Sequence, residues 1–433
     1  MDTEPMESRP AVDDDALARE ALSVLDANWT GRATMPAPGL YPHQWSWDSA
    51  FVAIGLARSH PSRAMAELRG ALAGQWRDGM VPHMIFRTAE AYFPGPAVWR
   101  SQDHEDAPAD LPTSGLTAPP LHALAAWWIW RHHGDRAVGF VREAYPRLAA
   151  HHDYLAATRD LGGSGLAAIV HPWESGMEDS PAWDRPLAAL PGAPPNGAGP
   201  AGYTDHFVWL ATRYRDSGYR PEYLGQEHPF AVEDPMFNGM WLAACEALAE
   251  LAPVAGADSR PHAERAARIR RALLDRLWDG GFHARDLRTG RLLRLATVGG
   301  FGPLLDPGMP GDRVEDMVRT LSSARFMGAS GYPVPSCDVR AEQFDRARYW
   351  RGPSWINMNW LLCRACAVHG LWDLAEGLAA DTLRLVRQAG FRECYDPFDG
   401  SGRGCRDFSW SAALTLDLLA DGGVLDGGAG RCR

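Results

Sequence analysis

The chain has 433 residues, of which 46% are hydrophobic and 22% charged, a composition that excludes a mainly disordered protein. Its 43 basic and 54 acidic residues give a net charge of −11 without any basic run, which argues against a nucleic acid or an anionic membrane as partner. All 43 basic residues are Arg, so the chain has no P-loop, Schiff-base or kinase-type lysine.

Helical patterns run from near the start of the chain to its end. Residues 1–12 are expected to form a flexible tail, and acidic residues at 13–15 precede an apolar pattern with helical spacing at 16–29. Further helices are predicted at 47–59, 62–77, 119–132, 138–158, 205–215, 234–253, 259–278, 311–323, 353–369, 371–389 and 408–420. These roughly twelve helices indicate an all-α toroid of helical hairpins. We expect one domain over 13–425 and a C-terminal tail at 426–433.

Long loops rich in Gly, Pro, Trp and acidic residues separate the predicted helices. They cover 32–46, 79–118, 160–204, 279–310, 326–352 and 390–407. Loops longer than ~15 residues are uncommon in compact domains unless they carry function. We therefore expect all of them except 279–310 to meet at one mouth of the toroid and to form the site.

The cysteines and the apolar segments predict neither a metal site nor a membrane anchor. Seven cysteines are scattered along the chain, and Cys363 and Cys366 lack a second pair that would complete a zinc site, so reduced and mostly buried thiols are expected. No secretory signal is apparent, and the longest apolar run, near 123–130, is far shorter than the ~20 residues that span a bilayer. We expect a cytoplasmic protein without cofactor, and a homo-oligomer is compatible with the sequence.

Eighteen tryptophans give the first indication of a ligand. Trp45 and Trp47 lie beside Asp48 where the predicted loop 32–46 meets the helix predicted at 47–59, and Trp173 precedes Glu174 in another predicted loop. An indole ring can stack on the C–H face of a pyranose while a neighbouring carboxylate accepts its hydroxyl protons, so this pairing is typical of sugar binding. Five other tryptophans lie in apolar helices and are expected to be core: Trp127, Trp128, Trp130, Trp241 and Trp278.

Two acidic clusters lie in loops that are far apart in the sequence. The first contains Glu174, Glu178, Asp179 and Asp184, and the second contains Glu393, Asp396 and Asp399. Glycoside hydrolysis needs two carboxyl groups across the sugar bond, one protonated and one ionised. On composition alone, catalysis and salt-bridged or helix-capping loops are equal alternatives.

Seven motifs in order carry a resemblance to a known family. They are YPHQWSWDSAF (41–51), GMVPHMIF (79–86), YFPGP (92–96), TSGLTAPP (113–120), HPWESGMEDSPAWD (171–184), YWRGPSWINMNW (349–360) and FRECYDPFDGSGRG (391–404). Together they resemble glycoside hydrolase family 63, most closely its short bacterial members, the mannosylglycerate and glucosylglycerate hydrolases. The resemblance implies an (α/α)6 barrel and inverting, exo-acting hydrolysis of a small α-glucoside or α-mannoside.

The resemblance also implies roles for the acidic residues. Glu393 falls on the family's general base, and Glu178 falls where the family has an Asp as general acid, usually followed by Asn. This chain has Asp179 in place of that Asn. Either Glu178 is the acid, or Asp179 takes over, or the activity is weak or altered. Glu178 is favoured, and Asp179 is then expected to accept N–H groups of its own loop.

Sugar contacts are implied for a further set of residues. Trp47 and Asp48 should hold the non-reducing sugar, and Arg351 and Trp355 should close its subsite, although Arg351 could instead clamp Glu393 or Asp48. The other residues expected at this subsite are Tyr41, Gln44, Trp45, His83, Trp173, Glu174 and Gly176. His43, His83 and His171 lack the spacing of metal ligands.

The resemblance is weakest on the aglycone side. Ala118 replaces a common Gln, and Asp205, His206 and Phe207 lie where those enzymes supply Arg and Tyr to the glycerate carboxylate. Arg213, Arg215 and Arg220 are alternative sources of that charge. Two other functions stay open: an impaired barrel that only binds sugar, because of the exchanges at 178 and 179, and a barrel that performs another acid–base reaction on a sugar-like metabolite.

Overall fold

The computed structural model describes residues 13–37, 39–190, 200–329 and 332–420, except for the side chains of 200–205. The tails predicted at 1–12 and 426–433 lie outside the described residues.

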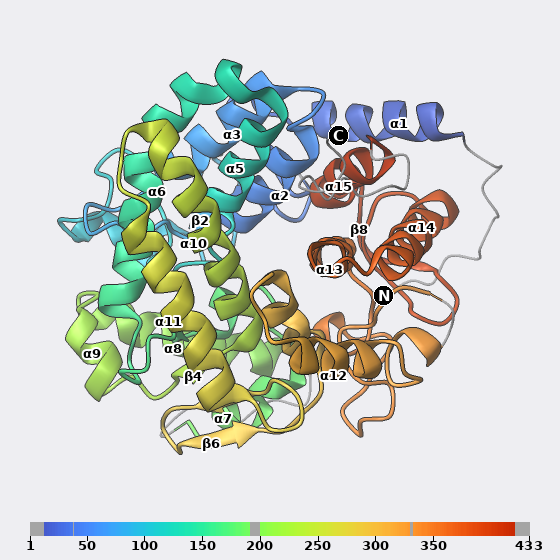
Figure 1. Cartoon of the computed structure of the whole chain (residues 1–433). Coiled ribbons are helices and arrows are strands. Elements are labelled where there is room, and N and C mark those ends of the chain that lie inside the picture. Colours follow the sequence, from blue (N-terminus) through green and yellow to red (C-terminus); the bar gives the residue numbers. More distant parts are fainter. Residues whose placement is uncertain (1–12, 38, 191–199, 330–331, 421–433) are drawn as a thin grey trace.

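Six elements form a closed inner ring. They are α2 (Ser46–Leu56), α5 (His122–His133), α10 (Pro235–Ala255), the 3₁₀ helix η5 (Val298–Leu305), α13 (Ile356–Val368) and α15 (Ser409–Ala420). Each packs against the next in this order, and α15 packs against α2, which closes the ring (Figure 1). Every residue of α2 and residues 356–367 of α13 are buried, as expected for helices covered on all sides.

Six further helices form the outer ring. They are α1 (Asp14–Ala27), α3 (Pro61–Ala73), α6 (Val138–Thr158), α11 (Arg260–Leu277), α12 (Gly311–Leu321) and α14 (Trp372–Ala389). Each contacts an inner element: α1 packs on α15, α3 on α2, α6 on α5, α11 on α10, α12 on η5 and α14 on α13. Outer helices bury one stripe only, as α11 does with Ala266, Ile269 and Leu273. The predicted (α/α)6 barrel is confirmed.

One predicted helix forms but lies outside the barrel, and one barrel element was missed. The helix predicted at 205–215 is α8 (Pro200–Asp216), which packs on the short α4 (Pro96–Trp99) outside both rings. The position in the inner ring is instead taken by η5, which lies in the segment 279–310 that was predicted as a loop. A Cβ on Gly302 of η5 would lie 2.5 Å from Met236 Cα, and one on Gly239 would lie 2.4 Å from Gly302 C. The close approach of η5 to α10 therefore requires glycines, and these weaken the helical pattern in the sequence.

Short antiparallel strands brace the loops at the candidate motifs. β1 (Gln44–Trp45) pairs with β2 (Met84–Ile85), and β7 (Arg392–Tyr395) pairs with β8 (Gly402–Arg406). A four-stranded sheet has the order β3 (Ala168–Ile169), β4 (Val232–Glu233), β5 (Ala284–Asp286) and β6 (Arg291–Leu293). The remaining elements are α7 (Asp184–Ala188), α9 (Pro221–Gln226), η1 (Ser101–Asp103), η2 (Gly134–Ala137), η3 (Pro172–Ser175), η4 (Pro181–Trp183), η6 (Met327–Ala329) and η7 (Tyr349–Arg351).

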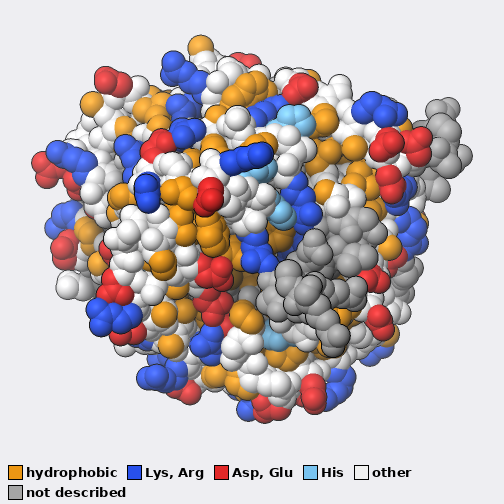
Figure 2. All heavy atoms as spheres, turned by 45° about the horizontal axis from the view of Figure 1, so that its top comes forward, with side chains coloured by type: hydrophobic (Ala, Val, Ile, Leu, Met, Phe, Trp, Pro, Cys, Tyr) orange, Lys and Arg blue, Asp and Glu red, His pale blue; other side chains and the backbone are white. Residues whose placement is uncertain are grey.

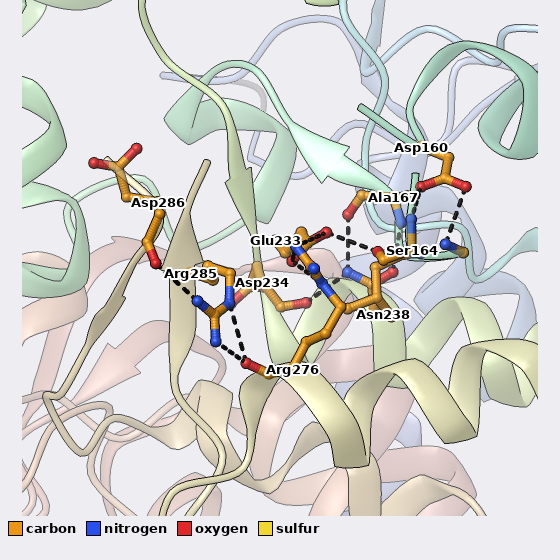
Figure 3. A network of polar contacts seen from close by, with 12 residues as sticks. Asp160, Ser164, Ala167, Glu233, Asp234, Asn238, Arg276, Arg285 and Asp286 are labelled. Carbon is orange, nitrogen blue, oxygen red and sulfur yellow. Dashed lines mark hydrogen bonds and ion pairs between the residues drawn. The ribbon is translucent and has the colours of Figure 1, made fainter. Parts of the chain in front are cut away.

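A polar network fixes the chain just before the acidic loop at 171–184. Glu233 of β4 accepts hydrogen bonds from Arg276 (3.0 Å) and from Ser164 Oγ (2.8 Å), as Figure 3 shows. The Asn238 amide of α10 bonds both the N–H (2.8 Å) and the carbonyl (2.9 Å) of Ala167. The segment that enters β3 is thus tied to the inner ring and to α11 of the outer ring.

The surface carries both signs of charge. On the face drawn in Figure 2, acidic and basic side chains are interspersed with hydrophobic ones. Within the described part of the chain, no helix is both long enough and apolar enough to cross a membrane.

Candidate active site

Glu393 is held by donors from three separate segments. Its Oε1 accepts hydrogen bonds from the hydroxyls of Tyr41 (3.0 Å) and Tyr349 (2.7 Å), and its Oε2 accepts one from the backbone N–H of Cys405 (3.0 Å). The side chain is 2% exposed. The β7–β8 pairing brings Cys405 opposite the start of β7, so the hairpin itself positions one of the three donors.

Gly404 makes room for this carboxylate. Its φ is +68°, and a Cβ at this position would lie 2.3 Å from Glu393 Oε2. A residue with a side chain would therefore be strained and would displace Glu393.

Two opposing influences act on the Glu393 carboxyl. Burial raises its pKa above the ordinary value, and the hydrogen bonds from Cys405, Tyr349 and Tyr41 oppose this rise because they favour the ionised form. A buried carboxylate with three donors can accept a proton from a bound water.

Glu178 has a different environment. It follows Gly176, whose φ of +68° places the backbone so close to Trp47 that a Cβ would lie 2.5 Å from the indole ring. Burial, together with the nearby charges of Glu393 and Asp179, raises the pKa of Glu178 to about 8, whereas hydrogen bonds from the backbone and from Trp350 oppose the shift. This shift favours the protonated form of Glu178, the form that can donate a proton.

The charges of Glu178 and Glu393 also raise the pKa values of four other side chains. Burial raises the pKa values of Tyr41, Tyr92 and Tyr349, and the charges of Glu178 and Glu393 raise them further. The pKa of Asp48 is also well above its usual value, because it is buried and because these two carboxyls lie nearby. The structure thus brings together two loops that are far apart in the sequence.

Asp48 and Trp47 lie at this site, as the sequence predicts. Asp48 is in the first turn of α2 and is 4% exposed. Trp47 packs edge-on against Phe51 (5.6 Å between centroids) and Trp410 (5.3 Å), which fixes the orientation of its ring.

Asp179 does not accept N–H groups of its own loop, so that prediction was wrong. Its two oxygens accept hydrogen bonds from Nε (2.9 Å) and Nη2 (3.0 Å) of Arg348, and Oδ1 also accepts one from Nε of Arg351 (3.1 Å). Arg351 binds Asp184 with its other nitrogens, at 2.8 Å for Nη1. Arg351 is thus a clamp, but on the acidic loop and not on Glu393 or Asp48.

Glu174, for which the resemblance implies a sugar contact, is bound by protein donors in the structure. Its Oε2 accepts hydrogen bonds from Arg159 Nη1 (2.8 Å) and the Val170 N–H (2.7 Å), and its Oε1 accepts one from the Thr117 N–H (3.1 Å). It is completely buried, and both oxygens are occupied by protein donors.

Gln44 and Trp355 are also interior. The Gln44 amide donates to Ser49 Oγ (2.9 Å) and accepts from Arg87 Nε (3.0 Å), and the side chain is fully buried. Trp355 is buried and stacks in parallel on Trp350, with 3.8 Å between ring centroids. Both side chains are therefore held by other protein groups. The motifs did not reveal this, because membership in a motif does not specify in which direction a side chain points.

The half-buried rings of Tyr41, Trp45 and Tyr92 contact one another beside Glu393, which Tyr41 binds. Trp45 meets Tyr41 (5.3 Å) and Tyr92 (5.2 Å) edge-on, and Trp173 lies parallel to His83 (5.9 Å). Burial lowers the pKa of His83 to about 3, so its ring is neutral, and its Nδ1 is 2.6 Å from Ser114 Oγ.

Tyr92, Tyr349, Arg348 and Cys405 were missed in the prediction of the site. Tyr92 and Tyr349 stand within the motifs YFPGP and YWRGPSW, so a signal was present without a role attached to it. Arg348 lies just before the motif that begins at Tyr349. Cys405 contributes only its backbone N–H, and a pattern of side chains gives no signal for such a contact.

The arginines considered for the aglycone side have other partners. Arg213 stacks on Trp209 at 4.4 Å, Arg215 donates to the Val98 carbonyl (2.7 Å), and Arg220 donates to the Ser217 carbonyl (2.8 Å). His206, Phe207 and Ala118 are buried, and the side chain of Asp205 lies outside the described residues. Across the parts of the chain that the structure describes, no three His, Cys, Asp or Glu side chains are grouped to hold a metal.

Comparison with known proteins gives consistent matches. A family model described as the mannosylglycerate hydrolase MGH1-like glycoside hydrolase domain matches residues 41–411. The chain is 38% identical to the mannosylglycerate hydrolase of Rubrobacter radiotolerans (95% of this chain, 98% of that one) and 36% identical to the glucosylglycerate hydrolase of Mycolicibacterium hassiacum (93% and 97%). The GH63 mannosylglycerate hydrolase of Thermus thermophilus, solved with Tris and D-glycerate, superimposes with a TM-score of 0.86 at 37% identity (93% and 100%). These matches confirm the resemblance to glycoside hydrolase family 63.

Proposed function

The chain belongs to the MGH1-like family of glycoside hydrolases, and we propose that it is an inverting, exo-acting hydrolase of a small α-glucoside or α-mannoside. The substrate would resemble mannosylglycerate or glucosylglycerate, the compounds after which its relatives are named. The solved relative with D-glycerate supports an aglycone of that size.

One observation carries the proposal: two buried carboxyl groups of one site have different hydrogen-bond surroundings. Burial raises the pKa of Glu178 to about 8, whereas at Glu393 three hydrogen-bond donors favour the ionised form and oppose the rise in pKa that burial causes. A glycosidase needs this combination of one acid and one base.

The reaction follows from these two states. Glu178 gives its proton to the glycosidic oxygen while the bond from that oxygen to the anomeric carbon breaks. Glu393 takes a proton from a water that attacks the anomeric carbon from the opposite face, so the configuration inverts. Glu178 is then ionised and Glu393 protonated, and exchange with solvent restores both.

The sugar would lie between Trp47 and the carboxyl of Asp48. The indole face suits the C–H face of a pyranose, and Asp48, buried near both catalytic carboxyls, is placed to accept sugar hydroxyl protons. Trp45, Tyr92, Trp173 and His83 would then line the path of the substrate at the half-buried rim.

Hydrolysis assays with matched variants test the proposal. The substrates are mannosylglycerate, glucosylglycerate and the corresponding aryl α-glycosides, and the variants are Glu393→Gln, Glu178→Gln and the exposed control Glu222→Gln. Wild type and control should release sugar, and Glu393→Gln should lose about 10²–10⁴-fold in kcat. Sugar binding by the wild type without any turnover would instead support a barrel that only binds sugar.

A further inference from the structure

We propose that Asp179 is a positioning residue for the acid Glu178, and that it acts through the segment 348–351, which fixes the acidic loop relative to the base. This inference rests on the proposed function, because it concerns how the two carboxyls of that reaction are held apart.

The first support is the ion-pair geometry at Asp179. Arg348 binds both of its oxygens in a bidentate arrangement at 2.9 and 3.0 Å, and Arg351 adds a third bond at 3.1 Å. Such paired contacts restrain orientation as well as distance. Since Asp179 directly follows Glu178, its orientation limits where the Glu178 side chain can point.

The second support is that Arg351 holds the loop at two points. Its Nε bonds Asp179, and its Nη1 and Nη2 bond Asp184, so one guanidinium spans five residue steps of the acidic loop. The side chains of Arg351 and Asp179 are 8% and 9% exposed, so their contact is shielded from solvent and salt, whereas Asp184 is partly exposed.

The third support is that the same short segment also holds the base. Tyr349, between the two arginines, donates its hydroxyl to Glu393 Oε1 at 2.7 Å. The backbone N–H of Arg351 bonds the Arg348 carbonyl at 2.8 Å, which makes 348–351 a compact turn. One turn thus contacts the acidic loop on one side and the base on the other.

Asp179 also contributes its charge to the surroundings of Glu178. A neighbouring carboxylate favours the protonated form of an acid, and Asp179 raises the pKa of Glu178 in this way. The other titratable groups that influence, or are influenced by, Glu178 are Glu393, Asp48, Tyr41, Tyr92 and Tyr349.

The test compares Asp179→Asn with Asp306→Asn, two substitutions that remove a charge with little change of shape. Asp306 is a matched control, because it is buried and accepts two donors from Arg270 (2.5 and 2.6 Å), a residue of the outer helix α11. For each variant, kcat and KM are measured against pH on an unactivated α-glycoside and on an aryl α-glycoside with a good leaving group. Thermal unfolding is measured in parallel.

Asp179→Asn should lower kcat on the unactivated substrate about a hundredfold, with a much smaller loss on the aryl glycoside. The alkaline limb of its pH profile should move about one pH unit lower, because the like charge beside Glu178 is gone. Asp306→Asn should lower the unfolding temperature and leave the pH profile and the ratio of rates on the two substrates unchanged. If Asp179→Asn does not fold, Arg348→Gln, at the half-exposed partner, must show the same leaving-group-dependent loss.

A wild-type pH profile and a wild-type ratio of rates in folded Asp179→Asn would overturn the inference. Glu178→Gln, measured beside it, separates this failure from that of the proposed function. If Glu178→Gln loses the unactivated substrate while Asp179→Asn behaves as wild type, only the positioning role fails. If Glu178→Gln keeps full activity on that substrate, the assignment of the acid fails, and the inference fails with it.

Discussion

At the scale of single residues, the two candidate catalytic groups are both glutamates, and their neighbours make them different. Glu393 receives three hydrogen bonds that favour its charge, whereas burial and two neighbouring carboxylates favour the proton on Glu178. Protonation states at the site are therefore set by geometry and can be changed by single substitutions.

The acid side of the pH profile should respond to Tyr349. Tyr349→Phe removes the 2.7 Å hydrogen bond that favours ionised Glu393, so the pKa of Glu393 should rise. Since the base must be ionised to act, the acid limb of kcat/KM should move to higher pH. The control Tyr332→Phe removes a hydroxyl whose 2.9 Å bond goes to Gln388, and it should leave this limb in place. An acid limb at the wild-type pH in Tyr349→Phe would contradict the role of Glu393.

The alkaline limb of the pH–activity profile should reflect the loss of the proton from Glu178. Activity on a substrate with a poor leaving group should fall as the pH rises through about 8, where Glu178 loses its proton. An aryl glycoside with a good leaving group needs little protonation, so the same limb should be weak or missing with that substrate. Identical alkaline limbs for the two substrates would speak against Glu178 as the acid.

At this scale the sequence predicts residue types better than roles. The motifs correctly brought Trp47, Asp48 and the two glutamates to one place, but they also suggested sugar contacts for Glu174 and Gln44, which are completely buried. The difference depends on the direction of each side chain, and that is set by partners from other segments, such as Arg159 for Glu174.

At the scale of elements, the β7–β8 hairpin should tolerate no side chain at Gly404. Gly404→Ala should lower kcat about a hundredfold, because a Cβ 2.3 Å from Glu393 Oε2 must displace the base by a sizeable part of an ångström. Gly290→Ala is the matched control: Gly290 has a φ of +70° with no atom within 4 Å of the added Cβ. It should cost about 1–2 kcal/mol of stability and no activity. Equal kinetics of the two variants would disprove the close contact at Gly404.

The loop that carries the acid should depend on Glu174 for stability. Glu174→Gln leaves the buried Arg159 without its carboxylate partner, and we expect a loss of about 3–5 kcal/mol in the free energy of unfolding, measured with urea. Glu90→Gln on the surface should lose almost none. A stable Glu174→Gln protein with a raised KM would instead support the original view of Glu174 as a sugar ligand.

Element boundaries were predictable wherever the helical pattern was strong. The helix predicted at 138–158 matches α6, and the one predicted at 371–389 begins one residue before α14. The element η5 was not predictable in this way, because its glycines serve a close contact with α10 and not helix formation. The two-residue strands were not predictable either, because two residues are too few to show the alternating pattern of a strand.

At the scale of the whole molecule, the closed ring explains how distant loops form one site. Loops that leave the same end of the inner helices converge there, so Tyr41, Glu178, Tyr349 and Glu393 meet although their motifs span most of the chain. The sequence predicted the ring from helix number and the site from motif content. It could not predict the Arg348–Asp179 contact, which exists only once the ring has closed.

The central claim is that two carboxyls hydrolyse an α-glycoside with inversion, and the configuration of the first product tests it most directly. Proton NMR of the anomeric region is recorded in the first minutes after the enzyme is added to an α-glycoside on which it is active. We predict that the β-anomer of the free sugar appears first and that the α-anomer grows later by mutarotation. Initial release of the α-anomer would contradict the claim, because retention requires a covalent intermediate and a different role for Glu393.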